Sequence, residues 1–183
     1  QTRDAKHGSG ELLARNMHFQ ANTARQSRGA PARYTVPMPP IRSQATYDDV
    51  NLLLRLYEMR REARMREARA WFTANFRPQS WTEVTEKWPH GSAENASIRQ
   101  VLSYWEMVAS FVTSGVLYDE LFFENTRELL LCYVRIEKII PEVRKANNDP
   151  FAYHNLETVA KRFIEWMNQR AQGSYEAFAK RVG

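Results

Sequence analysis

Between residues 93 and 114 the apolar side chains recur every three or four positions, which is the spacing of one face of an α-helix. This repeat constrains the fold most strongly, because it predicts a helix of about six turns with one continuous apolar face. Tyr104, Met107 and Phe111 widen that face, so we expect the helix to lie at the centre of the core, with Gly115 as its C-terminal cap. The predicted inward residues are Ile98, Val101, Leu102, Trp105, Val108, Ala109 and Val112.

Helical spacing and helix start signals also occur in the rest of the chain after residue 46. Thr46-Tyr47-Asp48-Asp49 and Ser80-Trp81-Thr82-Glu83 are capping-box patterns, each of which predicts the start of a helix. Pro141 is expected to end or kink a helix, and Asp149-Pro150 is expected to cap and begin another. The predicted helices span residues 47–76, 81–88, 93–114, 119–123, 126–140 and 150–171, with a helical turn or two at 174–181.

The predicted core comes from one face of each of these helices. Sustained alternation of apolar and polar residues, which indicates strands, does not occur, and neither do Asn-Gly or Asp-Gly hairpin turns. The sequence therefore predicts an all-α fold, an irregular bundle of four to five main helices. The inward residues outside 93–114 are predicted to be Leu54, Tyr57, Met65, Ala68, Phe72 and Phe76, then Leu129, Leu130, Leu131, Tyr133, Val134, Ile136, Ile139 and Ile140, then Tyr153, Leu156, Ala160, Phe163 and Met167.

Positive charge is concentrated at the start of the chain. Residues 1–45 hold seven basic and two acidic residues, a net charge of +5, whereas residues 46–183 hold the other 19 basic and 19 acidic residues. Four of the eight prolines also fall in this segment, so residues 29–40 are predicted to be extended. We therefore predict two parts, a basic extended arm (1–45) and a helical domain (46–183).

The predicted arm has two interpretations. It is either a solvated leader, or an anchor that becomes ordered on a larger partner and buries its scattered apolar residues there. In the helical domain, Trp81 and Trp88 flank a short surface helix and are also candidates for a partner contact. The candidate partner-binding residues of the arm are Leu12, Met17, Phe19, Arg25, Arg28, Arg33, Tyr34, Val36, Met38 and Arg42.

The segment 58–69 is rich in arginine, interspersed with glutamates. We interpret it as a solvated helix face, with binding of nucleic acid or phosphate as the alternative. The acidic pairs Asp48-Asp49 and Asp119-Glu120 each fall where a predicted helix begins, so we interpret them as helix-capping groups rather than as catalytic carboxylates.

Signals for catalysis, metal binding and cofactors are absent from the sequence. The four histidines have no metal-ligand spacing, and neither a phosphate-binding glycine loop nor a nucleophile motif occurs. Cys132 is the single cysteine, lies in an apolar run, and is predicted to be buried and inert. These observations predict a protein that is not an enzyme and needs no cofactor or metal.

The sequence resembles an uncharacterised bacterial family of helical proteins over roughly residues 50–145. The resemblance rests on 103–117 with the acidic turn and Leu-Phe pair at 119–122, and on the arginine- and alanine-rich segment 61–69. Many relatives carry one membrane helix before this domain, where this chain has its proline- and arginine-containing arm. The resemblance implies a helical fold and assigns no activity.

Three functions are compatible with this pattern. The first is a non-enzymatic accessory or scaffold subunit that docks on a larger protein complex through the arm. The second is an RNA- or DNA-associated protein, for example one bound to the ribosome, whose arm contacts phosphates. The third is a protein bound to an acidic membrane surface. We expect a cytoplasmic location or the cytoplasmic face of a membrane, and, since the chain begins at Gln1, a segment upstream.

Overall fold

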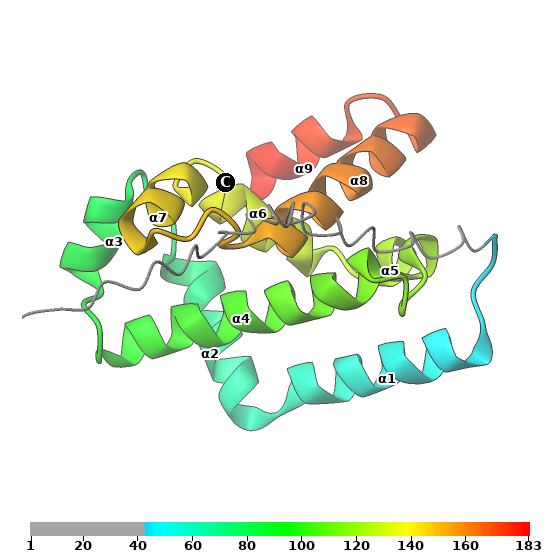
Figure 1. The fold of residues 1–183 in the computed structure, drawn as a ribbon, viewed down its shortest axis with the longest axis horizontal. Coiled ribbons are helices and arrows are strands. Elements are labelled where there is room, and N and C mark those ends of the chain that lie inside the picture. Colours follow the sequence, from blue (N-terminus) through cyan, green and yellow to red (C-terminus); the bar gives the residue numbers. More distant parts are fainter. Residues whose placement is uncertain (1–42) are drawn as a thin grey trace, which may run out of the picture. The chain divides into compact units, whose positions relative to one another are not determined.

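The computed structural model describes residues 43–183, and these residues form helices joined by short turns, with no strand among them (Figure 1). The all-α fold class is therefore confirmed. Four helices have 13 or more residues and form the main body. The helices are α1 (Tyr47–Arg61), α2 (Ala63–Asn75), α3 (Trp81–Lys87), α4 (Ala93–Thr113), α5 (Asp119–Asn125), α6 (Glu128–Ile136), α7 (Ile140–Asn147), α8 (His154–Arg170) and α9 (Ser174–Val182).

Helix α4 is the central element. It packs chiefly against α2 and α8, and in Figure 1 it crosses the middle of the bundle with α1 running beside it. The helix ends at Thr113, and Gly115 follows with a φ of 73°, the left-handed conformation of a helix-ending glycine. All seven residues predicted to face inward on this helix are buried. The strongest sequence signal thus identified the centre of the core.

The predicted continuous helix 47–76 is wrong, because the chain breaks it at Glu62. That residue has φ −55° and ψ 146°, an extended conformation that ends α1. Helix α2 then runs in a different direction, across α4 (Figure 1). Met65, Ala68, Phe72 and Phe76 are buried as predicted. In α1, however, Leu56 is the buried leucine, and Leu54 and Tyr57 are exposed, so their prediction as core residues is wrong.

Two further helix boundaries differ from prediction. Pro141 lies in the first turn of α7 rather than at the end of a helix, a position where a proline needs no hydrogen-bond donor. The side chain of Asp149 accepts a hydrogen bond from the Phe151 N–H at 2.9 Å within a turn, and α8 starts only at His154. The proline and the aspartate thus correctly indicated that the chain turns at these positions. They did not indicate where the neighbouring helix begins or ends.

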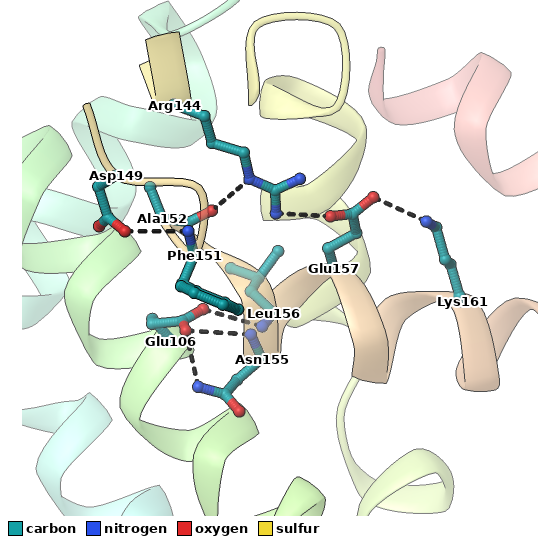
Figure 2. A network of polar contacts seen from close by, with 9 residues as sticks. All are labelled: Glu106, Arg144, Asp149, Phe151, Ala152, Asn155, Leu156, Glu157 and Lys161. Atoms are coloured by element: carbon teal, nitrogen blue, oxygen red, sulfur yellow. Dashed lines mark hydrogen bonds and ion pairs between the residues drawn. The ribbon is translucent and has the colours of Figure 1, made fainter. Parts of the chain in front are cut away.

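The N-terminus of α8 is capped from another helix. The carboxylate of Glu106, on α4, accepts hydrogen bonds from the N–H groups of Asn155 and Leu156 at 3.1 and 2.8 Å (Figure 2). The Asn155 side-chain amide donates a third at 2.9 Å. Because the first N–H groups of a helix have no partner within the helix, this carboxylate satisfies them and joins α8 to α4.

A second polar link joins α7 to α8. The guanidinium of Arg144 donates to the Ala152 carbonyl at 3.1 Å and to Glu157 at 2.7 Å, and Lys161 donates to Glu157 at 2.7 Å (Figure 2). Hydrogen bonds from Lys161 and Arg144 hold the pKa of Glu157 below its usual value. These contacts fix the turn between α7 and α8.

Candidate functional site

Helix α1 has apolar side chains on two faces. On its inner face Asp49 and Leu56 are buried, at 1% and 5% exposure. On its outer side lie Tyr47, Val50, Leu54 and Tyr57, which are 79%, 40%, 56% and 47% exposed. We call these four residues the α1 stripe. Their spacing of three, four and three residues places them along one line of the helix.

The inner face of α1 is held by polar groups as well as by packing. The Asp49 carboxylate accepts hydrogen bonds from the N–H and hydroxyl of Thr46 at 2.7 and 2.6 Å, which completes the predicted capping box. Its other oxygen accepts from the N–H of Tyr118 at 2.8 Å. Farther along, the Tyr104 hydroxyl donates to the Leu56 carbonyl at 2.7 Å, and burial raises the pKa of that hydroxyl to about 12. These contacts fix which side of α1 faces away from the core.

A groove opens beside the α1 stripe, between α1, α4 and the junction of α5 with α6. Its volume is about 250 Å³, and Leu54 and Tyr57 belong both to the stripe and to its lining. Most of its lining is apolar, with Leu56, Val108 and Phe122 among its residues, and Asn125 and Thr126 add polar groups. The stripe and the groove therefore form one continuous apolar surface.

Arg60 is the charged residue of the groove lining. Its guanidinium lies over the rings of Tyr57 and Trp105, at 5.3 and 5.8 Å from their centroids. It forms an ion pair with Glu128 at 3.5 Å, and Arg69 holds the same carboxylate with two hydrogen bonds. Two arginines thus share one carboxylate next to an apolar groove.

The two tryptophans predicted to contact a partner pack against the core. Both are half-buried, and the ring of Trp88 lies 5.3 Å from that of Phe76 and 5.7 Å from that of Trp71. The N–H of Trp81 donates to Glu142 at 2.7 Å. The structure does not bring these tryptophans to the α1 stripe. The ten predicted arm residues, Leu12, Met17, Phe19, Arg25, Arg28, Arg33, Tyr34, Val36, Met38 and Arg42, all lie outside the described residues.

The α1 stripe and the groove were not predicted from the sequence. The spacing of the four stripe residues was visible, but Leu54 and Tyr57 were assigned to the core. A helix with apolar residues on two faces does not reveal from sequence which face is buried. Arg60 was noted only as part of a solvated arginine-rich segment, and its contacts with Trp105 and Glu128 join residues 45 and 68 positions away.

Other titratable groups of residues 43–183 lie away from the α1 stripe and the groove. Among these residues no three His, Cys, Asp or Glu side chains are grouped as metal ligands would be. Cys132 is fully buried as predicted, and burial raises its thiol pKa well above the usual value. Arg135 is a buried cation whose guanidinium donates to the carbonyls of Phe76 and Thr73 at 3.0 and 3.5 Å, where α2 ends. A cation at a helix C-terminus is a stabilising arrangement.

The fold and the site together define a class of protein: an all-α domain whose first helix presents an apolar outer face. The chain belongs to the family described as "Domain of unknown function (DUF4760)", whose sequence profile matches residues 45–163. This confirms the predicted resemblance to an uncharacterised family. No curated protein and no solved structure matches the chain. Within residues 43–183, every helix is too short or too polar to traverse a lipid bilayer.

Proposed function

We propose that this chain is a non-enzymatic accessory subunit that docks on a larger protein assembly through the α1 stripe and the N-terminal arm. The proposal depends on one observation, the exposure of Tyr47, Val50, Leu54 and Tyr57 along a single line of a helix whose opposite face is buried. Contiguous apolar surface of this kind marks interaction sites, because its exposure to water is unfavourable. The arm joins the body directly before this helix, so both elements lie on one stretch of sequence.

The stripe defines the chemistry of the partner. Helix α1 has 15 residues, about 22 Å of length, and its apolar residues follow the spacing of a helix–helix seam. Asp48 and Glu58 are balanced by Arg55 and Arg61 on its exposed surface, so charge does not select the partner. We therefore propose that the partner offers an amphipathic helix of similar length, whose apolar residues cover the stripe.

Substitution of Val50 tests the proposal without touching the groove, because Val50 belongs to the stripe and not to the groove lining. The Val50→Glu variant places a charge in the proposed seam. The matched control is Met59→Glu, since Met59 is also an exposed apolar residue of α1, at 46%, but lies outside the stripe. The tagged full-length chain and both variants are expressed in the native host, and their assemblies are separated by size under native conditions.

We expect the wild-type chain and Met59→Glu to migrate with a larger assembly, and Val50→Glu to migrate mostly as free subunit. A charge buried at the centre of an apolar interface typically weakens binding by about 10²-fold or more. Equal migration of the two variants would refute docking through the stripe. A purified chain that dimerises in a Val50-dependent manner would identify a second copy as the partner and refute the accessory-subunit proposal.

The arm's charge supports a second candidate, association with RNA or DNA. Its net charge of +5 is the whole excess positive charge of the chain, and arginines bind phosphates by releasing counterions. Such binding weakens steeply with salt, whereas docking through the apolar stripe does not. An association with nucleic acid that is unchanged between low and high salt would exclude this candidate. For either partner, we propose a cytoplasmic location or the cytoplasmic face of a membrane.

A further inference from the structure

The groove beside α1 also has the features of a small-molecule site. Its volume of about 250 Å³ lies just below the range of about 300–1,000 Å³ typical of ligand pockets, so its ligand is smaller than a drug-sized compound. Residues of α1, α4 and α5 contribute to its lining. It therefore lies between elements that the fold holds together, rather than within one loop.

Most of the groove lining is apolar, and its charge comes from Arg60. Leu53, Leu56, Val108 and Phe122 supply side chains that favour a hydrocarbon group over water. Arg60 is the charged member of the lining, and its side chain is 16% exposed. The groove thus combines an apolar interior with a cation that is mostly removed from solvent.

The charge near Arg60 is not fully balanced. Arg60 and Arg69 share Glu128, and Arg69 forms the closer, two-bond contact with it. The three side chains are at most 25% exposed and carry a net charge of +1. An anionic group at the Arg60 end of the groove would compensate this charge in a partly desolvated setting.

We propose that the groove binds a small carboxylate with an apolar tail, in chemical terms a medium-chain fatty acid. Arg60 pairs with the carboxylate, and the side chains of Leu53, Leu54 and Tyr57 flank the tail. Leu54 and Tyr57 belong to both the stripe and the groove, whereas Tyr47 and Val50 do not line the groove, so Val50→Glu tests the docking separately from ligand binding.

Calorimetric titration of the full-length chain with decanoate, below its micelle concentration, tests this assignment, with decanol as the uncharged probe of equal tail length. We expect one decanoate per chain and a Kd about tenfold lower than that of decanol, the difference that a charge-assisted hydrogen bond supplies. The matched variants are Arg60→Gln and Arg61→Gln. Both arginines lie over the Tyr57 ring, but of the two Arg60 lines the groove.

Arg60→Gln should raise the Kd of decanoate about tenfold and leave that of decanol nearly unchanged, while Arg61→Gln changes neither. Circular dichroism of each variant checks that it is folded. Equal affinity of the wild-type chain for decanoate and decanol, equal effects of the two arginine variants, or no saturable binding would overturn the proposal.

Discussion

At the scale of single residues, two carboxylates fix helix N-termini in this chain. Asp49 caps its own helix and also binds the N–H of Tyr118, whereas Glu106 caps a helix that lies about 50 positions later in the sequence. The first is a local pattern that the sequence shows. The second is a tertiary contact between α4 and α8, two of the longest helices. Its removal should therefore destabilise the whole bundle.

Substitution of Glu106 should therefore lower stability more than its partly buried position alone suggests. Glu106→Ala leaves the N–H groups of Asn155 and Leu156 without their acceptor, and we expect a loss of about 1–3 kcal/mol in the free energy of unfolding. Glu106→Gln keeps one acceptor oxygen and should lose less. Urea unfolding followed by circular dichroism measures both. Glu67→Ala, at an exposed position of α2, is the control, and an equal loss there would contradict the capping role.

The buried thiol of Cys132 makes stability depend on alkaline pH. Burial raises its pKa well above 9.0 in the folded chain, while in the unfolded chain the thiol titrates at about 8.5. Above that pH the unfolded state loses a proton that the folded state keeps, so stability falls as pH rises. Between pH 9 and 10 we expect the free energy of unfolding of the wild-type chain to fall about 1.4 kcal/mol more than that of Cys132→Ala.

The measurement is a series of urea unfolding curves across this pH range. Tyr104 and Tyr175, whose pKa values burial raises to about 12, add a further fall above pH 10 in both chains, so the comparison depends on the lower range. Identical pH slopes for the two chains between pH 9 and 10 would mean that Cys132 is accessible to solvent.

At the scale of elements, the break between α1 and α2 decides which surfaces α1 presents. Glu62 has the extended conformation that a residue before proline prefers, and Ala63 occupies the first position of α2, where a helix needs no N–H donor. A continuous helix would instead place Ala63 in its interior. Proline at this position therefore distinguishes the two arrangements.

We expect Ala63→Pro to leave stability unchanged or to raise it by about 0.4–1 kcal/mol, because it restricts the unfolded chain without removing a helix hydrogen bond. The control is Ala70→Pro, at an exposed position inside α2, which should cost about 3 kcal/mol or more. Thermal unfolding of both variants gives the comparison. A large loss for Ala63→Pro would indicate that α1 and α2 form one helix in solution.

At the scale of the whole molecule, the described residues contain a complete core. The buried side chains range from Asp49 to Phe178 and include residues of every helix. We therefore predict that residues 1–37 contribute little to the stability of the body and serve the partner contact that we propose.

Deletion of residues 1–37 should accordingly change the free energy of unfolding by less than about 1 kcal/mol, within the range of surface changes. In the proposed docking it should also weaken association with the larger assembly. Circular dichroism and urea unfolding test the first expectation, and native size separation tests the second. Undiminished association would remove the arm from the interface, and loss of the folded state would show that the core extends beyond the described residues.

The sequence predicted the elements better than it predicted their boundaries. Periodicity identified α4 and its buried residues, because a single apolar face leaves one way to pack. It failed for Leu54 and Tyr57, because α1 is apolar on two faces, and for Pro141, because proline is compatible both with the end of a helix and with its first turn. The α1 stripe was a visible pattern, but its exposure was not predictable from the pattern.

By itself, the sequence determined the all-α class, the central helix, the buried cysteine and the concentration of positive charge in residues 1–45, because each depends on local composition or spacing. Only the tertiary structure decided which face of α1 is exposed, that Glu106 caps α8 and that Arg60 meets Trp105 and Glu128 at a groove. The physical reason is that these contacts join residues 45 to 68 positions apart, and their geometry depends on how the helices pack.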